Sequence, residues 1–222
     1  MGKTIGFLGA GQLGEPMVER LLGAGHDVLV YARRDDTRRR LEAHGAALAD
    51  SVADLAAGSD ILISCLFSDA QLRETGLGPD GFVANAKPGS VFVSHTTGTV
   101  STLEALRADS ASGPVVLDAP VSGTADDIAA GTLTVLIGGP SDAVAAVTPV
   151  LTAYADPVVA TGPLGSALAL KLINNLLFAA LNFWLRQRNW ALSWASNRVC
   201  CCPRCRCAAR GATRRSRRSA SV

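Results

Sequence analysis

The chain has 222 residues, 48% of them hydrophobic, and a formal net charge of +2, so it can bury a sizeable core and carries no strong overall charge. The charge is uneven, because residues 1–182 hold 11 Lys and Arg against 19 Asp and Glu, whereas residues 183–222 hold 10 Arg and no acid. One Cys, Cys65, in the acidic part argues against a disulfide-stabilised secreted protein. With no signal peptide before the first predicted strand, we expect a cytoplasmic location.

A short apolar run at residues 4–8 is followed by glycines at the spacing G-x-G-x-x-G and then by a helical pattern. The run predicts a buried parallel strand, and apolar residues at four-residue steps predict a helix. Gly9 then allows a tight turn, Gly11 lets the backbone approach a pyrophosphate, and Gly14 lets helix and strand pack closely. A glycine turn without a ligand is the alternative, but the strand and helix favour a dinucleotide loop. The predicted cofactor-binding residues here are Gly9, Ala10, Gly11, Gln12, Leu13 and Gly14.

A second strand is predicted at residues 27–32, and its end bears on the choice of cofactor. An acidic residue at this place binds the ribose 2′-hydroxyl of NAD, whereas an Arg suits the 2′-phosphate of NADP. The strand is followed by Arg33 and Arg34, so we expect NADP, bound through Arg33. Asp35 and Asp36 follow closely, which leaves NAD possible, and solvated loop charges are the plain alternative for both Arg.

Strands and helices continue to alternate along the chain. Strands are predicted at residues 61–66, 89–94, 115–118 and 133–137, and helices at residues 37–44, 51–58, around 70–75 and 99–108. This alternation predicts an α/β fold, a Rossmann-type doubly wound and mostly parallel sheet. Ligands bind such sheets at the carboxyl ends of the strands, which places the loops at residues 67–69, 95–98 and 119–124 at the site.

Two polar features of these loops have competing interpretations. His95 follows a strand end, but no carboxylate lies at a recognisable spacing to orient it, so a loop histidine is favoured over a general base. Thr96 or Thr97 is expected to cap the next helix and to face the cofactor. The three His are scattered without ligand spacing, so no metal site is expected.

A long apolar helix is predicted at residues 166–181, after the break at Gly162 and Pro163. Lys171 and Asn175 share one face of it, with Asn174 adjacent. Such polar groups in an apolar helix are costly unless they are partnered or used, so a functional role is favoured over a Lys that snorkels at the helix edge. The same polar groups interrupt the apolar stretch, and we expect no membrane span.

Four motifs together resemble the β-hydroxyacid dehydrogenase family, which includes 3-hydroxyisobutyrate dehydrogenase, tartronate semialdehyde reductase and, more distantly, 6-phosphogluconate dehydrogenase. The resemblance covers roughly residues 3–181. Its motifs are Gly6-Phe-Leu-Gly-Ala-Gly-Gln-Leu-Gly-Glu-Pro-Met17, His95-Thr-Thr97, Asp118-Ala-Pro-Val-Ser-Gly123 with Ala130-Gly-Thr-Leu133, and Lys171-Leu-Ile-Asn-Asn175. Thr124, Ala167 and His95 are mild departures, standing where Gly, Gly and Met are usual.

The resemblance implies an NAD(P)-dependent oxidoreductase that transfers a hydride between the nicotinamide and a small 3-hydroxy acid or its semialdehyde. It implies a homodimer or tetramer. It implies that Leu66 and Thr97 lie against the cofactor. The implied catalytic residues are Lys171, Ser122 and Asn175, and the implied substrate-binding residues are Ser122, Gly123, Thr124, Asn174 and Asn175.

Proton transfer agrees with this assignment, because hydride transfer leaves or consumes a proton on the substrate oxygen. Lys171 is the acid/base candidate with both a motif and a suitable setting. A free Lys has a pKa of about 10.4, and useful acid/base catalysis needs a value closer to neutral. Burial against the cofactor is expected to lower the pKa of Lys171.

The predicted domains are a cofactor-binding domain at residues 1–162, the start of an incomplete helical domain at residues 163–195, and an irregular tail at residues 196–222. The tail is rich in Cys and Arg. Zinc binding through Cys202 and Cys205 lacks a paired ligand set, and nucleic-acid binding by the Arg run is less common than a solvated basic tail. We favour out-of-frame translation as the origin of the tail, because the family pattern ends and the composition changes at the same place. The alternative to an active dehydrogenase is therefore a non-catalytic, cofactor-binding remnant.

Overall fold

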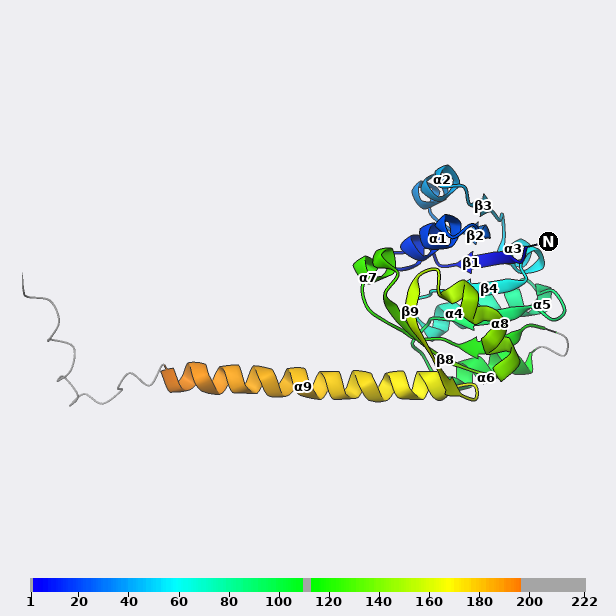
Figure 1. Cartoon of the computed structure of the whole chain (residues 1–222). Coiled ribbons are helices and arrows are strands. Elements are labelled where there is room, and N and C mark those ends of the chain that lie inside the picture. Colours follow the sequence, from blue (N-terminus) through cyan, green and yellow to red (C-terminus); the bar gives the residue numbers. More distant parts are fainter. Residues whose placement is uncertain (1, 110–112, 197–222) are drawn as a thin grey trace, which may run out of the picture. The chain divides into compact units, whose positions relative to one another are not determined.

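The computed structural model describes residues 2–109 and 113–196, with side chains described as far as residue 188. The chain divides into two compact units, Met1–Asn175 and Leu176–Val222. The first unit contains a nine-stranded sheet, shown with its helices in Figure 1. The predicted α/β fold is therefore confirmed.

Six strands form the parallel part of the sheet in the order β3-β2-β1-β4-β5-β6. They are β1 (Thr4–Leu8), β2 (Asp27–Tyr31), β3 (Ala47–Leu48), β4 (Ile61–Ser64), β5 (Val91–Ser94) and β6 (Val115–Asp118). The chain runs outward from β1 to β3 and then returns to β4 on the other side of β1. Ligands bind at such a switch point, outside the carboxyl ends of the strands.

Three further strands complete the sheet beyond β6. They are β7 (Val121–Ser122), β8 (Leu133–Gly138) and β9 (Ala155–Gly162). β8 is antiparallel to β6 and β7, and β9 is parallel to β8. The sequence pattern did not predict β9. Most of its residues are at least partly exposed, and it contains Pro157, so it shows neither an alternating nor a continuous apolar pattern.

Each face of the sheet has its own apolar core, covered by its own helices. One core takes buried residues from α1 (Gly14–Gly23), α2 (Asp35–Ala43), α7 (Ala125–Ala130) and α8 (Ser141–Leu151). The other takes them from α3 (Val52–Gly58), α4 (Asp69–Gly76), α5 (Phe82–Asn85), α6 (Val100–Ala108) and the first turn of α9 (Ser166–Ser196). The doubly wound arrangement follows from these two covered faces.

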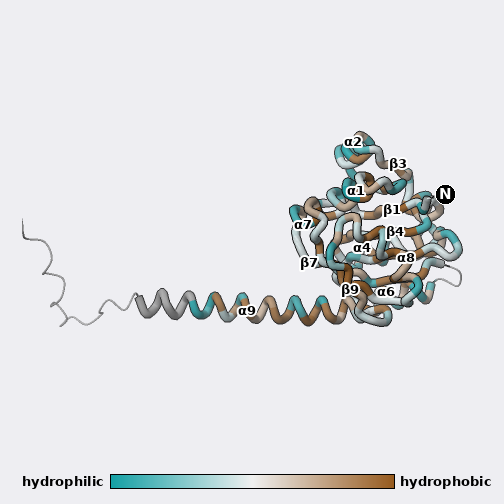
Figure 2. Tube along the Cα trace, in the orientation of Figure 1, coloured by the Kyte–Doolittle hydropathy of each residue, from teal (hydrophilic) through white to brown (hydrophobic). Residues whose placement is uncertain are grey.

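The α9 helix continues from the first unit into the second, and the described part of the second unit, residues 176–196, is entirely helical. Figure 2 shows brown apolar residues recurring along α9 among teal polar ones. By length and composition, Ser166–Arg188 is apolar enough to cross a membrane, a test that core helices of soluble proteins also pass. The expected absence of a membrane span stays a prediction. The predicted domain boundary at residue 162 also stays a prediction.

Candidate functional site

The glycine loop between β1 and α1 has two glycines that the protein itself requires. Gly9 has φ of +97°, and a Cβ on it would lie 2.5 Å from the carbonyl oxygen of Cys65. A Cβ on Gly14 would lie 2.2 Å from the carbonyl oxygen of Gly9. These two positions therefore need glycine for the turn and for close packing of helix and strand, as predicted.

Gly11 differs from its neighbours, because a Cβ on it would meet no atom within 4 Å. Packing within the described chain therefore gives no reason for glycine here, whereas a pyrophosphate against the backbone does. The start of α1 supports this, since its N-cap, Leu13, makes no side-chain cap. Within the first turn the N–H of Glu15 donates to the carbonyl of Gly11 at 2.9 Å and Pro16 has no N–H, so it is the N–H groups of residues 12–14 that remain for an anion. The loop fits a dinucleotide.

A cleft of about 660 Å³ opens beside this loop, at the carboxyl ends of β1, β2 and β4. Of the predicted cofactor residues, Gly9, Ala10, Gly11, Arg33 and Leu66 line it. Gln12 is exposed, Leu13 is half-buried and Gly14 is buried behind the loop. Thr97 is exposed and is not among the lining residues, so its cofactor role stays a prediction.

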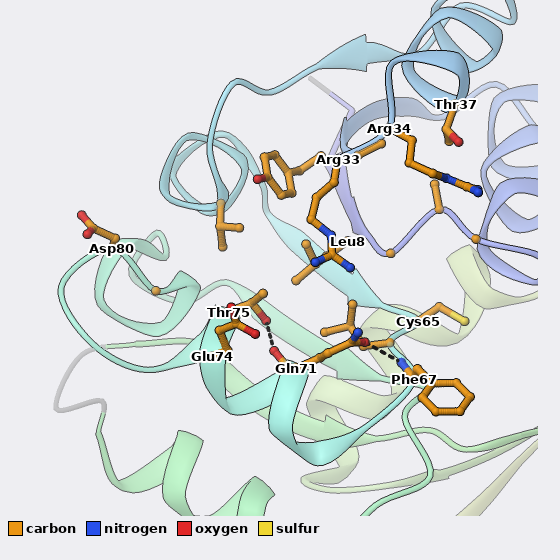
Figure 3. Close-up of a pocket in the computed structure, with 18 of the residues that line it drawn as sticks. Leu8, Arg33, Arg34, Thr37, Cys65, Phe67, Gln71, Glu74, Thr75 and Asp80 are labelled. Carbon is orange, nitrogen blue, oxygen red and sulfur yellow. Dashed lines mark hydrogen bonds between the residues drawn. The ribbon is translucent and has the colours of Figure 1, made fainter.

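The wall of the cleft at the end of β2 is positively charged. Figure 3 shows Arg33 pointing into the cleft and Arg34 lying beside Thr37. Asp35 and Asp36 do not line it, and Asp36 instead pairs with Arg39. The acids on the lining are Glu74, on α4, and Asp80, in the segment that follows α4. The cationic wall suits a phosphate group more than a ribose hydroxyl.

Two loops at the ends of β4 and β5 are tied together by a carboxylate. Asp69 Oδ2 accepts the backbone N–H of Thr99 at 2.9 Å, and a Cβ on Gly98 would lie 1.9 Å from Asp69 Oδ1. The expectation that Thr96 or Thr97 caps the following helix is wrong, because its N-cap is Thr99. Asp69 lies 30 residues away from Thr99, so local sequence could not reveal this contact.

His95 lies in the loop after β5, and its side chain is buried. Its Nδ1 lies 2.5 Å from the carbonyl oxygen of Ala119, and its Nε2 lies 2.8 Å from the hydroxyl of Tyr154. A carbonyl only accepts, so Nδ1 carries the proton and Tyr154 donates to Nε2. Burial lowers the pKa of His95 to about 4. The ring is therefore a neutral link between Ala119 and Tyr154, and the expectation that it is no general base stays a prediction.

Lys171 and Ser122 meet at the end of the sheet, in the first unit. The Lys171 Nζ donates to Ser122 Oγ at 2.6 Å, from α9 to β7. Both side chains are half-buried. Burial lowers the pKa of Lys171 from its ordinary value, which is the direction that acid/base catalysis requires.

The other predicted substrate residues are placed differently. The Thr124 hydroxyl accepts the N–H of Asp127 and donates to its carboxylate, so it serves as the N-cap of α7. It thereby supports the segment that follows Ser122 and Gly123, and its expected contact with the substrate stays a prediction. Asn174 and Asn175 are exposed, and neither side chain makes a hydrogen bond within the described chain.

One residue of this region was quoted in a motif but given no role. Asp118, the last residue of β6, is buried, and its two carboxylate oxygens accept the N–H groups of Gly165 and Leu168 at the start of α9. The signal in the sequence that could have revealed this role was an acidic residue at the end of a buried apolar strand. Its partners lie 47 and 50 residues ahead, which no local pattern indicates.

Within the described residues no three His, Cys, Asp or Glu side chains gather to hold an ion. Cys202, Cys205 and the Arg-rich tail lie outside the described residues, so the interpretations of the tail stay hypotheses.

Known proteins resemble this chain over most of its length. Residues 4–162 match the family model described as the NAD binding domain of 6-phosphogluconate dehydrogenase. The chain is 34% identical over 183 residues to an uncharacterized oxidoreductase, YkwC, of Bacillus subtilis, covering 81% of this chain and 63% of that protein. It is 34% identical over 178 residues to 3-hydroxyisobutyrate dehydrogenase of Pseudomonas aeruginosa, covering 80% of this chain and 60% of the other.

A solved structure gives the same result. Mycobacterium tuberculosis 3-hydroxyisobutyrate dehydrogenase with L-serine superposes with a TM-score of 0.81 at 30% identity, over 88% of this chain and 67% of that one. The chain thus spans about 60% of the length of the curated relatives it matches. With the glycine loop, the cationic cleft and the Lys171–Ser122 pair in place, the chain belongs to the family of NAD(P)-binding domains of 6-phosphogluconate and 3-hydroxyisobutyrate dehydrogenases.

Proposed function

We propose that this chain is the cofactor-binding part of an NADP-preferring dehydrogenase that acts on a small 3-hydroxy acid or its semialdehyde, with Lys171 as general acid/base. The hydrogen bond from Lys171 Nζ to Ser122 Oγ carries this proposal. It places an amine with a lowered pKa beside a hydroxyl, at the sheet edge where this fold binds ligands.

The proposed chemistry at this edge is a proton transfer held in place by hydrogen bonds. When bound, the nicotinamide cofactor accepts a hydride from the substrate carbon or gives one to it. Lys171 in its neutral form takes the proton of the substrate hydroxyl during oxidation, and its ammonium form returns a proton to the carbonyl oxygen during reduction. Ser122 holds the amine in one direction, and with the N–H of Gly123 it binds the substrate carboxylate. Asn175 is proposed to contact the substrate hydroxyl.

The preference for NADP is supported by charge at the end of β2. Arg33 and Arg34 are exposed on the cleft wall, whereas the nearby Asp36 is paired with Arg39. A guanidinium gives a phosphate two parallel hydrogen bonds, which no ribose hydroxyl can accept in the same way. We therefore assign the 2′-phosphate to Arg33, with Arg34 and Thr37 beside it.

A protein that binds the cofactor without turnover is the second candidate. Its support is the exposure of Asn174 and Asn175, which leaves the proposed substrate contacts on α9 unsupported within the described chain. The two candidates share the cleft and differ at Lys171. In either case we propose a cytoplasmic protein, since Cys65 is a free thiol in the structure.

The test has two stages. Titration with NADPH and NADH, followed by fluorescence, measures cofactor binding. Turnover is then assayed with 3-hydroxyisobutyrate, L-serine and the corresponding semialdehydes, for the wild type and for Lys171→Met. The dehydrogenase proposal expects turnover that Lys171→Met lowers by about 10²–10⁴-fold while cofactor affinity is kept. Binding without turnover on every substrate supports the second candidate, and absence of binding contradicts both.

A further inference from the structure

Asp118 lies where the sheet meets α9, and both oxygens of its carboxylate accept hydrogen bonds there. It is 1% exposed. Its Oδ1 accepts the N–H of Gly165 at 2.7 Å, and its Oδ2 accepts the N–H of Leu168 at 2.7 Å. Both acceptors are thus bound to donors of the first turn of α9, which otherwise lack partners at a helix start. A carboxylate so engaged and so buried is a poor candidate for contact with the substrate.

The segment that begins at Asp118 contacts α9 a second time. Ser122, four residues further on, accepts the hydrogen bond of Lys171 Nζ. Leu168 and Lys171 are three residues apart and therefore lie on one face of the helix. One short stretch of chain thus fixes that face at its backbone and at its side chain.

Lys171 also lies where the helix loses its cover. Leu168 is buried, Lys171 is half-buried, and Leu172 is 46% exposed. Among the described residues beyond Lys171, no α9 side chain donates to or accepts from the sheet; Asn182 bonds to Phe178 within the helix. The position of the amine therefore depends on how the first turn is held.

Close packing leaves that first turn little freedom. A Cβ on Gly138 would lie 2.6 Å from Asp118 Oδ1, and a Cβ on Gly165 would lie 2.9 Å from Val100. The hydroxyl of Ser166 lies 2.7 Å from that of Thr161 on β9. Glycine at both contact points allows the helix start to come close enough for the carboxylate to reach two N–H groups.

We propose that Asp118 is a positioning residue, which fixes the rotation and depth of the first turn of α9 so that the Lys171 amine reaches Ser122 and the substrate oxygen. Its importance for turnover rests on the proposed function. The placement of the amine does not, and it can be measured in the free chain.

The chain has only three Lys, at positions 3, 87 and 171, so its lysine side chains can be resolved individually. Titration of [¹³C,¹⁵N]lysine-labelled protein, followed at Cε and Nζ, reports the pKa of Lys171, which Lys171→Arg assigns. Burial holds that pKa below its ordinary value. In Asp118→Asn the first turn loses one acceptor, the amine becomes more solvated, and its pKa is expected to rise toward that of free lysine.

The direction of the change separates anchoring from a charge effect. Removal of a nearby negative charge disfavours the ammonium and lowers a lysine pKa, which is opposite to the expected rise. Asp69→Asn is the matched control, since Asp69 also accepts a backbone N–H at a helix start, that of α6. It should leave the Lys171 signal unchanged.

A rise in Asp118→Asn together with no change in Asp69→Asn supports the proposal. An unchanged or lowered Lys171 pKa in a folded Asp118→Asn protein overturns it. If the variant does not fold, hydrogen exchange of the wild type gives a second test. The amides of Gly165 and Leu168, bonded to the Asp118 carboxylate, should exchange slowly with D₂O. Rapid exchange of both amides would overturn the proposal. Failure of cofactor binding or turnover would contradict the proposed function but leave this measurement intact.

Discussion

Lys171 and Ser122 are 49 residues apart in the sequence, and their side chains form a hydrogen bond of 2.6 Å between α9 and β7. The pair joins two motifs that the sequence presents separately. The capping box of Thr124 with Asp127 holds one side of it, and the Asp118 carboxylate holds the other. The proposed acid/base group therefore lies in a framework of backbone contacts.

Ser122→Ala should lower turnover without changing cofactor affinity. A hydrogen bond to a charged group contributes about 1.5–3 kcal/mol, which corresponds to a loss of roughly 10–100-fold in kcat/KM. Steady-state kinetics with the best substrate of the panel, together with NADPH titration, measures both quantities. Thr132→Ala is a control, since its exposed hydroxyl bonds only to a backbone carbonyl in the same region. Equal kinetics of Ser122→Ala and wild type would remove Ser122 from the proposed site.

Gly11→Ala should abolish tight cofactor binding without destabilising the fold. A Cβ at Gly11 meets no protein atom within 4 Å, so thermal unfolding should be nearly unchanged. The same Cβ would collide with a pyrophosphate, and affinity should fall roughly tenfold or more, at least about 1.4 kcal/mol. Gly23→Ala is the control, because it is equally open in the structure and lies at the far end of α1. Unaltered NADPH affinity of Gly11→Ala would contradict the assignment of the loop.

Arg33→Ala should weaken NADPH binding selectively. Loss of a charge-assisted hydrogen bond of about 1.5–3 kcal/mol predicts an affinity for NADPH about 10–100-fold lower, with NADH little affected. Arg39→Ala controls for the loss of one positive charge, since Arg39 pairs with Asp36 and does not line the cleft. Equal wild-type affinities for the two cofactors would show that Arg33 does not bind a 2′-phosphate.

The sequence predicts those parts of the fold and the site that depend on local spacing. Short motifs contain the glycine loop, the end of β2, Lys171 and Ser122. In each motif the residue types permit only a few functions. The roles of Asp118, Asp69 and His95 depend on partners many residues away, so no short pattern contains them. Thr124 has a role that the family motif does not indicate, since its side chain serves as the N-cap of α7.

His95 should make the stability of the fold depend on pH. The pKa of His95 falls from 6.5 to about 4 on burial, so between these values the unfolded chain binds a proton that the folded chain does not. Stability should therefore rise with pH through this window and be lost as the pH falls from about 6.5 toward 4. The full effect is of order 3 kcal/mol.

Urea unfolding at pH 5 and pH 7 tests this, with His95→Asn as the comparison. Asn keeps an N–H donor for the carbonyl of Ala119 and does not titrate. The variant should be less stable than the wild type at pH 7. Its free energy of unfolding should, however, change much less between pH 5 and pH 7 than that of the wild type. An equal pH dependence in both proteins would mean that His95 is not the group responsible.

Apolar side chains along α9 should make this chain associate. Large residues of the helix are exposed in the structure, among them Leu172, Leu176, Leu177, Leu181 and Trp184. Burying each such side chain against a partner is worth roughly 1.5–3 kcal/mol, and several together rival a domain's stability of about 5–15 kcal/mol. We therefore expect concentration-dependent assembly of the 222-residue chain in size-exclusion chromatography with light scattering.

Leu176→Glu with Leu181→Glu should shift that assembly toward monomer, because charges placed among the exposed apolar side chains must be desolvated in any contact. Asn182→Glu with Gln187→Glu is the matched control, since it adds the same two negative charges to the same helix and leaves its apolar side chains in place. Flotation with phosphatidylcholine vesicles distinguishes self-association from membrane binding. We expect the chain to remain with the soluble fraction, because the apolar stretch carries Lys171, Asn174 and Asn175. A monomer at all concentrations would contradict the association, and flotation with the vesicles would contradict the expected absence of a membrane span.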